Sequence, residues 1–234
     1  MKPQLRDEYF QEFEKMLVGI GKELETRQNK LVAFAAKVGR DYSPGGFMLV
    51  GRALNGGDPA WLPADMNDSD QRMKILAELR SSTFDNEWTE WLRKDHKRAF
   101  FRVGEKVFNK LFVHNENRFW ADQSVWSNLY KVTYSETGNP PKWLRDTQVP
   151  FVNKLLEMEH ACFRPTYMLI LAGEWWYRYH FDELGVERHK VADLHVEAAQ
   201  WGETKVVLAE HPQCKKEDKF VDQVFAGFEL LRKQ

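Results

Sequence analysis

Residues 47–57, FMLVGRALNGG, decide the fold of this chain. An apolar run leads straight into Gly51, and a short loop that ends in two further glycines follows. This pattern is typical of a buried parallel strand that delivers a loop to the edge of an α/β sheet, where ligands bind. Loops in this position ordinarily carry a reacting group at their first turn. No acid lies between Gly51 and Gly57, and the polar side chains there belong to Arg52 and Asn55.

Three further segments are predicted to be strands of the same sheet. They are SVWSNLYKV at residues 124–132, TYMLILAG at residues 166–173 and KVVLAE at residues 205–210. Residues 183–203 hold either a short strand or a loop. Strands that alternate with helical segments predict an α/β fold, namely a three-layer αβα arrangement with a doubly wound, mostly parallel sheet of about four strands.

Helical periodicity is expected on either side of these strands. An apolar stripe runs through residues 5–38, and helices are expected over residues 69–113, with a break near 81–85, and over residues 141–162. A last helix follows the HPQ tripeptide at residues 211–213. We expect a single domain over residues 1–234, in which residues 60–122 form a helical insertion.

Charge and cysteine content limit the partners and the compartment. The 34 basic and 35 acidic side chains nearly balance, which disfavours a broad nucleic-acid surface but remains compatible with a small local patch. A charged N-terminus and short apolar runs predict no signal peptide and no membrane span. Cys162 and Cys214 are too few and too far apart for a disulfide framework or an iron–sulfur cluster. We therefore expect a soluble, cytoplasmic, monomeric protein without a metal or other cofactor.

The four strand ends, taken in order, carry a family resemblance. VGRALNG, WSNLYK, LILAG and LAEHPQ together resemble the uracil-DNA glycosylase superfamily, and the turn TGNPP is similar to the stretch after the asparagine strand in its bacterial iron–sulfur branch. The resemblance covers about residues 43–57 and 123–230 and indicates a divergent member. It implies a DNA partner and a site that reads or excises a base flipped out of the helix.

The resemblance implies catalytic roles for His211 and Asn55. His211 would donate a hydrogen bond to base O2 as negative charge develops there, and a desolvated position after a strand would keep it neutral. The alternative is a surface histidine before a helix. Asn55 would orient water through its carbonyl, although an amide cannot take a proton.

Base binding is implied for Gly51, Asn128 and Trp61. Asn128 offers both a donor and an acceptor, as the O4 and N3–H of uracil require. Strand alternation places it on one face with Trp126 and Tyr130, so it would be a polar group among aromatic ones; alternatively it only terminates a strand. Trp61 either stacks on the flipped base or belongs to the core.

Phosphate binding is implied for Arg52, Lys131 and Gln213. Gln213 replaces the serine that commonly stands third in the family's His-Pro motif. Several other cations would extend a local phosphate track, unless they are simply solvated charges. These are Lys142, Arg145, Lys215, Lys216 and Lys219.

The first loop departs from the family where the chemistry is most demanding. The family usually has an Asp, Asn or Glu there to position or activate water, and those positions fall on Arg52 and Ala53. Asp58 and Asp65 either fold back as surrogates or act as loop and helix-cap residues.

Three functions therefore stay open. The resemblance favours excision or recognition of a damaged base in DNA. A catalytically weakened module that binds a nucleic acid or nucleotide on the same fold is the alternative. A third candidate is an enzyme that acts on a small molecule, such as a nucleotide hydrolase in which Arg52 holds phosphate.

Overall fold

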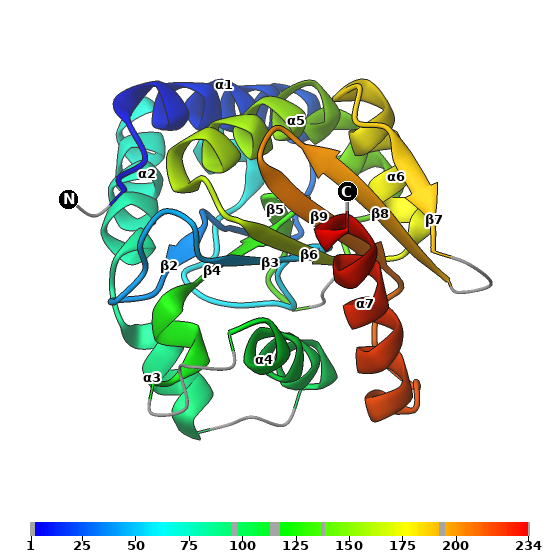
Figure 1. The fold of residues 1–234 in the computed structure, drawn as a ribbon. Helices are drawn as coiled ribbons and strands as arrows, with labels where there is room; N and C mark the ends of the chain where they lie inside the picture. The colour runs from blue at the N-terminus through cyan, green and yellow to red at the C-terminus, as the bar shows by residue number, and fades with distance from the viewer. Residues whose placement is uncertain (1–2, 95–97, 113–117, 137–138, 192–194, 234) are drawn as a thin grey trace.

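A seven-stranded mixed sheet forms the centre of the computed structural model, which describes residues 3–94, 98–112, 118–136, 139–191 and 195–233 (Figure 1). In spatial order its strands are β2 (Lys37–Val38), β4 (Ser124–Asn128), β3 (Phe47–Gly51), β6 (Tyr167–Leu171), β9 (Thr204–Ala209), β8 (Val196–Trp201) and β7 (Arg188–Lys190). Strands β4, β3, β6 and β9 are mutually parallel, whereas β2, β8 and β7 are antiparallel to their inner neighbours. The α/β class and the four central strands are thus confirmed, and the sheet is larger than the sequence predicts.

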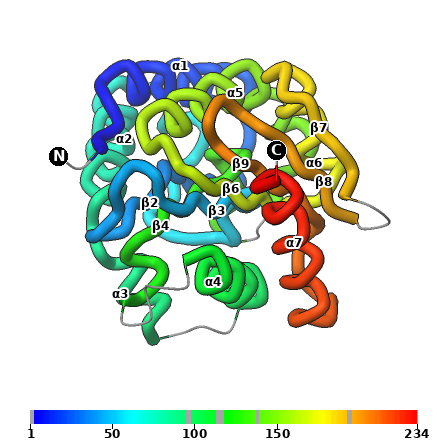
Figure 2. Tube along the Cα trace, in the orientation of Figure 1, coloured from blue at the N-terminus to red at the C-terminus, as the bar shows by residue number. Residues whose placement is uncertain are grey.

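Helices lie on both sides of this sheet, with α1 and α5 on one side and α4 and α7 on the other (Figures 1 and 2). The α-helices are α1 (Asp7–Leu24), α2 (Ser69–Thr83), α3 (Glu87–Lys94), α4 (Ala99–Leu111), α5 (Lys142–Phe163), α6 (Glu174–Glu183) and α7 (Glu217–Arg232). Two short 3₁₀ helices are η1 (Pro63–Asn67) and η2 (Trp120–Gln123). Within the described ranges, no helix combines the length and the apolar character that a membrane span requires.

Strand β3 separates two apolar cores. Met48 and Val50 pack into the core on the α1 and α5 side, and Phe47 and Leu49 pack into the core on the α4 and α7 side. All four side chains are fully buried. Because successive strand residues point to opposite faces, a continuous apolar run is what a strand covered on both faces requires.

The expectation of one helical stripe over residues 5–38 is wrong beyond Leu24. Residues Leu31–Ala33 form strand β1, which pairs with β5 (Val132–Tyr134) in a separate two-stranded sheet, and Lys37–Val38 form β2. Burial from residue 31 to 36 is continuous rather than confined to one helical face. The apolar residues that imitate the stripe are therefore strand residues.

The second predicted strand also ends earlier than expected, at Asn128. The chain then turns, and the buried side chain of Gln148 anchors the turn: its Oε1 accepts from the backbone N–H groups of Lys131 (3.0 Å) and Val132 (2.8 Å), and its Nε2 donates to the Val132 carbonyl (2.8 Å). Residues 132–134 consequently belong to the small sheet.

The described residues of the segment 60–122 are largely helical, but these helices do not pack as one separate unit. Helix α2 and η1 pack on α1, whereas α4 packs on β3 and α7. Ion pairs between exposed side chains also join α4 to α7, and they are Arg102–Glu217, Lys106–Glu217, Lys106–Asp218 and Lys110–Asp222. The segment therefore contributes to both cores.

Lys131 lies in the interior, so its predicted role in phosphate binding is wrong. Its Nζ contacts both carboxylate oxygens of Glu159 (2.7 and 2.8 Å) and the Ser127 hydroxyl (2.8 Å), and neither charged side chain is exposed. The Tyr9 hydroxyl and the Ser127 hydroxyl both donate to Glu159. Burial lowers the pKa of Lys131, and the nearby Glu159 charge opposes this shift. A fully enclosed ammonium cannot reach a phosphate.

The buried pair generates the first prediction. Lys131→Met should lower the free energy of unfolding by about 3–5 kcal/mol, because it leaves the Glu159 carboxylate buried without its counter-charge. The double variant Lys131→Met, Glu159→Gln should recover most of this loss, since glutamine can still bond with Tyr9 and Ser127. Urea unfolding followed by circular dichroism measures both effects.

An exposed lysine gives the matched control. Lys142 pairs with Asp146 at the surface, and Lys142→Met should change stability little. Equal losses in the single and double variants would contradict the assignment of this pair.

Candidate functional site

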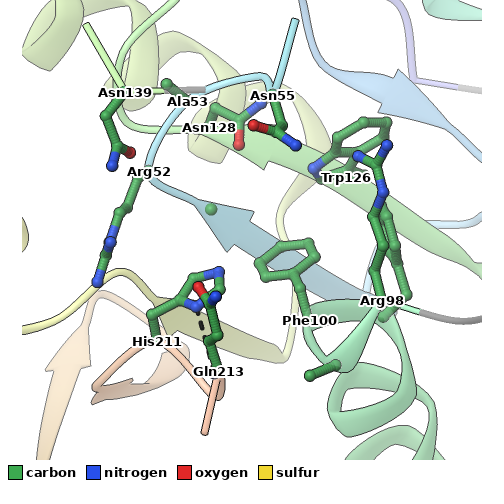
Figure 3. Close-up of a pocket in the computed structure, with 13 residues that line it drawn as sticks. Arg52, Ala53, Asn55, Arg98, Phe100, Trp126, Asn128, Asn139, His211 and Gln213 are labelled. Atoms are coloured by element: carbon green, nitrogen blue, oxygen red, sulfur yellow. Dashed lines mark hydrogen bonds between the residues drawn. The ribbon is translucent and has the colours of Figure 1, made fainter. Parts of the chain in front are cut away.

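A cavity of about 440 cubic ångströms opens at the carboxyl ends of β3 and β4. The loop after β3, the end of β4, the start of α4 and the loop after β9 line it. Its volume lies within the range of small-molecule sites, roughly 300–1,000 cubic ångströms. Figure 3 shows the side chains of Asn128, Phe100 and His211 around the same space.

Gly51 and Asn128 lie side by side at the base of the cavity, because the parallel register of β3 and β4 pairs these two residues. A Cβ atom on Gly51 would lie 2.5 Å from Asn128 Oδ1 and 3.3 Å from the Phe100 ring, so any larger residue would displace the Asn128 side chain. Asn128 is 1% exposed, and its amide nitrogen has no hydrogen-bond partner among the described residues. A buried donor without a partner is costly, so this amide is a candidate for binding a ligand.

His211 follows β9 and is held in one tautomer. Its Nδ1 accepts the backbone N–H of Gln213 (3.3 Å), so the proton of the neutral ring is on Nε2 (Figure 3). Burial, with a smaller contribution from the Arg52 charge, lowers the pKa of His211 to about 4. The site therefore contains a neutral histidine that is able to donate a hydrogen bond.

Aromatic rings form another wall. Phe100, at the start of α4, lies nearly parallel to the His211 ring, with 13° between the planes and 6.4 Å between the ring centroids. Trp126 also lines the cavity, and its buried Nε1 has no partner among the described residues. The cavity thus combines flat apolar surfaces with the side chains of Asn128 and Trp126, whose buried nitrogens have no partner among the described residues.

Arg52 lies at the edge of the cavity. Its Nε donates to the Ala172 carbonyl (2.5 Å), and its guanidinium lies 5.5 Å from the centroid of the Trp176 ring. Burial lowers the pKa of Arg52, and the charge of Glu210 opposes this shift. These contacts orient the guanidinium, and its predicted role toward phosphate stays a prediction.

No carboxylate is among the described residues that line this cavity. Ala53 and Asn55 from the first loop do line it, as the sequence predicts, with Asn55 at the exposed mouth. Asp65 instead accepts the backbone N–H of Leu62 (2.8 Å) at the start of η1, and Asp58 is an exposed loop residue. Neither aspartate acts as a surrogate acid in this arrangement.

Trp61 lies outside the cavity, which corrects its predicted role in base stacking. Its backbone bonds to both polar groups of Leu31 (2.7 and 2.8 Å), and its half-buried ring packs against the core. Sequence reasoning assigned no site role to five residues that line the cavity, namely Arg98, Ala99, Phe100, Phe101 and Asn139. Nothing in the local sequence distinguishes Phe100 from the buried Phe101 beside it.

A second cavity, of about 590 cubic ångströms, adjoins the first and shares Arg52, His211 and Gln213 with it. Gly173, at the end of the predicted strand segment 166–173, lines this second cavity rather than the first. Lys215 also lines it, where it pairs with Glu210.

Of the other predicted phosphate contacts, Lys142 pairs with Asp146, and Lys216 and Lys219 are exposed. Within the described part of the chain, no three His, Cys, Asp or Glu side chains gather as metal ligands would.

Comparison with known proteins adds no relative: no family model matches the chain, and no curated protein matches it.

The low pKa of His211 generates a pH prediction. The ring signals of His211 in an NMR titration should remain those of neutral imidazole from about pH 8 to about pH 5, because burial disfavours the cation. Arg52→Gln should raise the pKa of His211, but not to its usual value of 6.5, because Arg52 is the smaller cause. A wild-type midpoint near 6.5 would be incompatible with this geometry.

The same shift has a consequence for stability. The folded pKa lies below the unfolded one, so the contribution of His211 is present above pH 6.5 and is lost as the pH falls toward 4.

The contact of Gly51 with Asn128 generates a further prediction. Gly51→Ala should destabilise the fold by about 1–3 kcal/mol through overpacking and should shift the side-chain amide resonances of Asn128. Gly19→Ala is the control, because its Cβ would meet Phe151 at an ordinary 3.5 Å. If both variants left the Asn128 resonances in place, the close approach would be refuted.

Proposed function

We propose that the first cavity binds a nucleobase flipped out of DNA, and that the chain is a divergent relative of the uracil-DNA glycosylase superfamily. The observation that carries this proposal is Asn128 at the floor of the cavity, whose buried amide nitrogen has no hydrogen-bond partner among the described residues. A base edge with an exocyclic carbonyl and a ring N–H would satisfy the donor and the acceptor of this amide together. The three-layer, doubly wound arrangement of that superfamily is part of the proposal, and the helices on both sides of the sheet support it.

The neutral His211 supports the same ligand. Its Nε2–H would donate to a second carbonyl of the base, and it would stabilise negative charge on that oxygen if the N-glycosidic bond breaks. A neutral donor suits this buried position better than an imidazolium, because it donates its N–H without the desolvation cost of a cation. Phe100 would contact the flat face of the base.

The missing carboxylate bears on catalysis rather than on binding. With Ala53 at the position of the family's water-positioning residue, only Asn55 remains in that loop to orient water, and it cannot act as a base. We therefore propose that base recognition is strong relative to excision, and that excision by the wild-type protein is slow or absent. A catalytically weakened base-binding module is the second candidate, and the absence of a lining carboxylate favours it.

Excision assays on uracil, hypoxanthine and xanthine in single- and double-stranded oligonucleotides test this function. Wild-type activity should be slow, and Ala53→Asp combined with Arg52→Gln should raise it by about 10²–10⁴-fold, because a carboxylate then activates water without a neighbouring cation. His211→Ala should abolish the remaining activity. Robust wild-type excision that survives loss of both Asn55 and His211 would place the chemistry elsewhere.

Binding is measured separately on the same oligonucleotides. Asn128→Ala should weaken lesion-dependent binding on the order of tenfold. Asn109→Ala, at an exposed position on α4, is the matched control and should have no effect. If no modified base raised affinity over its unmodified counterpart, the proposed function would fall.

A further inference from the structure

The second cavity contains an exposed aromatic surface that the fold does not explain. Trp175 is 67% exposed, the largest exposed fraction among the described large hydrophobic side chains that face solvent. Its ring meets that of Trp176 edge-on, with 5.0 Å between the centroids and an interplanar angle of 83°. The guanidinium of Arg145, on α5, lies 4.4 Å from the centroid of the Trp175 ring. A large apolar ring held in position at the surface beside a cation suits a ligand that has both a flat ring and an anion.

This surface is continuous with the first cavity. Arg52, His211 and Gln213 line both cavities, so Arg52 stands on the boundary between them. A ligand that fills the first cavity and extends past Arg52 enters the second. A nucleic-acid strand has this shape, because each base is followed by a phosphate and then by another base.

The charges near Trp175 suit one strand rather than two. Arg178 pairs with Glu174 (3.5 Å) and Asp182 (3.8 Å), and Lys215 pairs with Glu210, so both cations are partly neutralised. Arg145 has no carboxylate partner among the described residues. The full chain carries a net charge of -1. A duplex-binding surface would need several free cations along two backbones, whereas a single strand needs fewer cations and an exposed ring.

We propose that the second cavity binds single-stranded DNA, with the base next to the flipped nucleotide stacked on Trp175. This inference deepens the proposed function and rests on it for the placement of the flipped base. A duplex does not offer a free base face to Trp175, because its bases are stacked inside the helix. An unpaired strand does, and its phosphates would lie along Arg52 and Arg145.

The experiment measures binding of undamaged DNA, so it does not depend on recognition of a lesion. Fluorescence anisotropy of a labelled oligothymidine, compared with a labelled duplex of the same length at low salt, gives the two affinities. The wild-type protein should bind the single strand more tightly. Trp175→Ala should weaken single-strand binding by about 5- to 100-fold, and Trp175→Phe should retain most of the affinity because it keeps a ring.

Trp143→Ala is the matched control. Trp143 is a half-buried tryptophan under a guanidinium, that of Arg27 at 4.8 Å, and it lies outside both cavities. It should leave single-strand binding unchanged, and thermal unfolding monitored by circular dichroism establishes that each variant folds.

Three results would overturn the inference: no binding of the undamaged single strand, equal or tighter binding of the duplex, or a Trp175→Ala variant that binds like the wild type. Lesion-dependent binding with an inert Trp175 would preserve the proposed function and reject this inference. Loss of single-strand binding in Trp175→Ala, with no preference of the protein for a lesion, would preserve this inference and reject the proposed function.

Discussion

The buried ion pair between Lys131 and Glu159 fixes the position of Asn128, the residue on which the candidate site depends. Lys131 also donates a hydrogen bond to Ser127, and both side chains contact Glu159 on helix α5. The residues before and after Asn128 are therefore bonded to each other and to this helix. Gln148, on the same helix, holds the backbone of the turn that follows. Such a pair contributes little net stability, because desolvation offsets its attraction, but it permits few alternative arrangements of the chain. Asn128 can remain unpartnered and still be held in place because its neighbours are so constrained.

The electrostatic character of the site follows from what surrounds the cavity. Arg52 is a cation at its edge, His211 is neutral, and no described lining residue is an acid. A site of this kind stabilises negative charge on a ligand and opposes positive charge. Departure of a base leaves negative charge on the base and positive charge on the sugar. Under the proposed function, the site would stabilise the first of these charges, and no described lining residue would stabilise the second.

Sequence reasoning found the parts of the fold that obey simple periodicity. Strands β3 and β6 and most of β9 are visible because they are apolar runs buried on both faces, whereas β4 mixes β-prone and polar residues. The polar residues at or after the ends of β3, β4 and β9 gather at one edge because parallel strands share it. The outer strands were harder to identify, because β2 has only two residues and β7 is mostly polar and exposed.

The site errors have a different physical origin. Lys131 is usually a surface residue type, and only the position of Glu159, 28 residues along the chain, explains its burial. Phe100 was missed because its place in the cavity depends on how α4 packs across β3 rather than on its neighbours in sequence. The roles of Arg52, Asn128 and His211 depend on tertiary neighbours as well, but their positions at strand ends made them visible. Local pattern thus locates the edge of the sheet, and long-range packing selects the side chains that complete the site.

The ion pairs between α4 and α7 join two walls of the first cavity. Phe100 is at the beginning of α4, and α7 begins six residues after His211, so Arg102–Glu217 and Lys106–Asp218 connect the supports of both rings. Burial fixes most other contacts around the cavity, whereas these pairs are partly exposed and ions in solution screen them. Higher ionic strength therefore weakens one of the links that hold the supports of Phe100 and His211 together, beside the apolar core that α4 and α7 share.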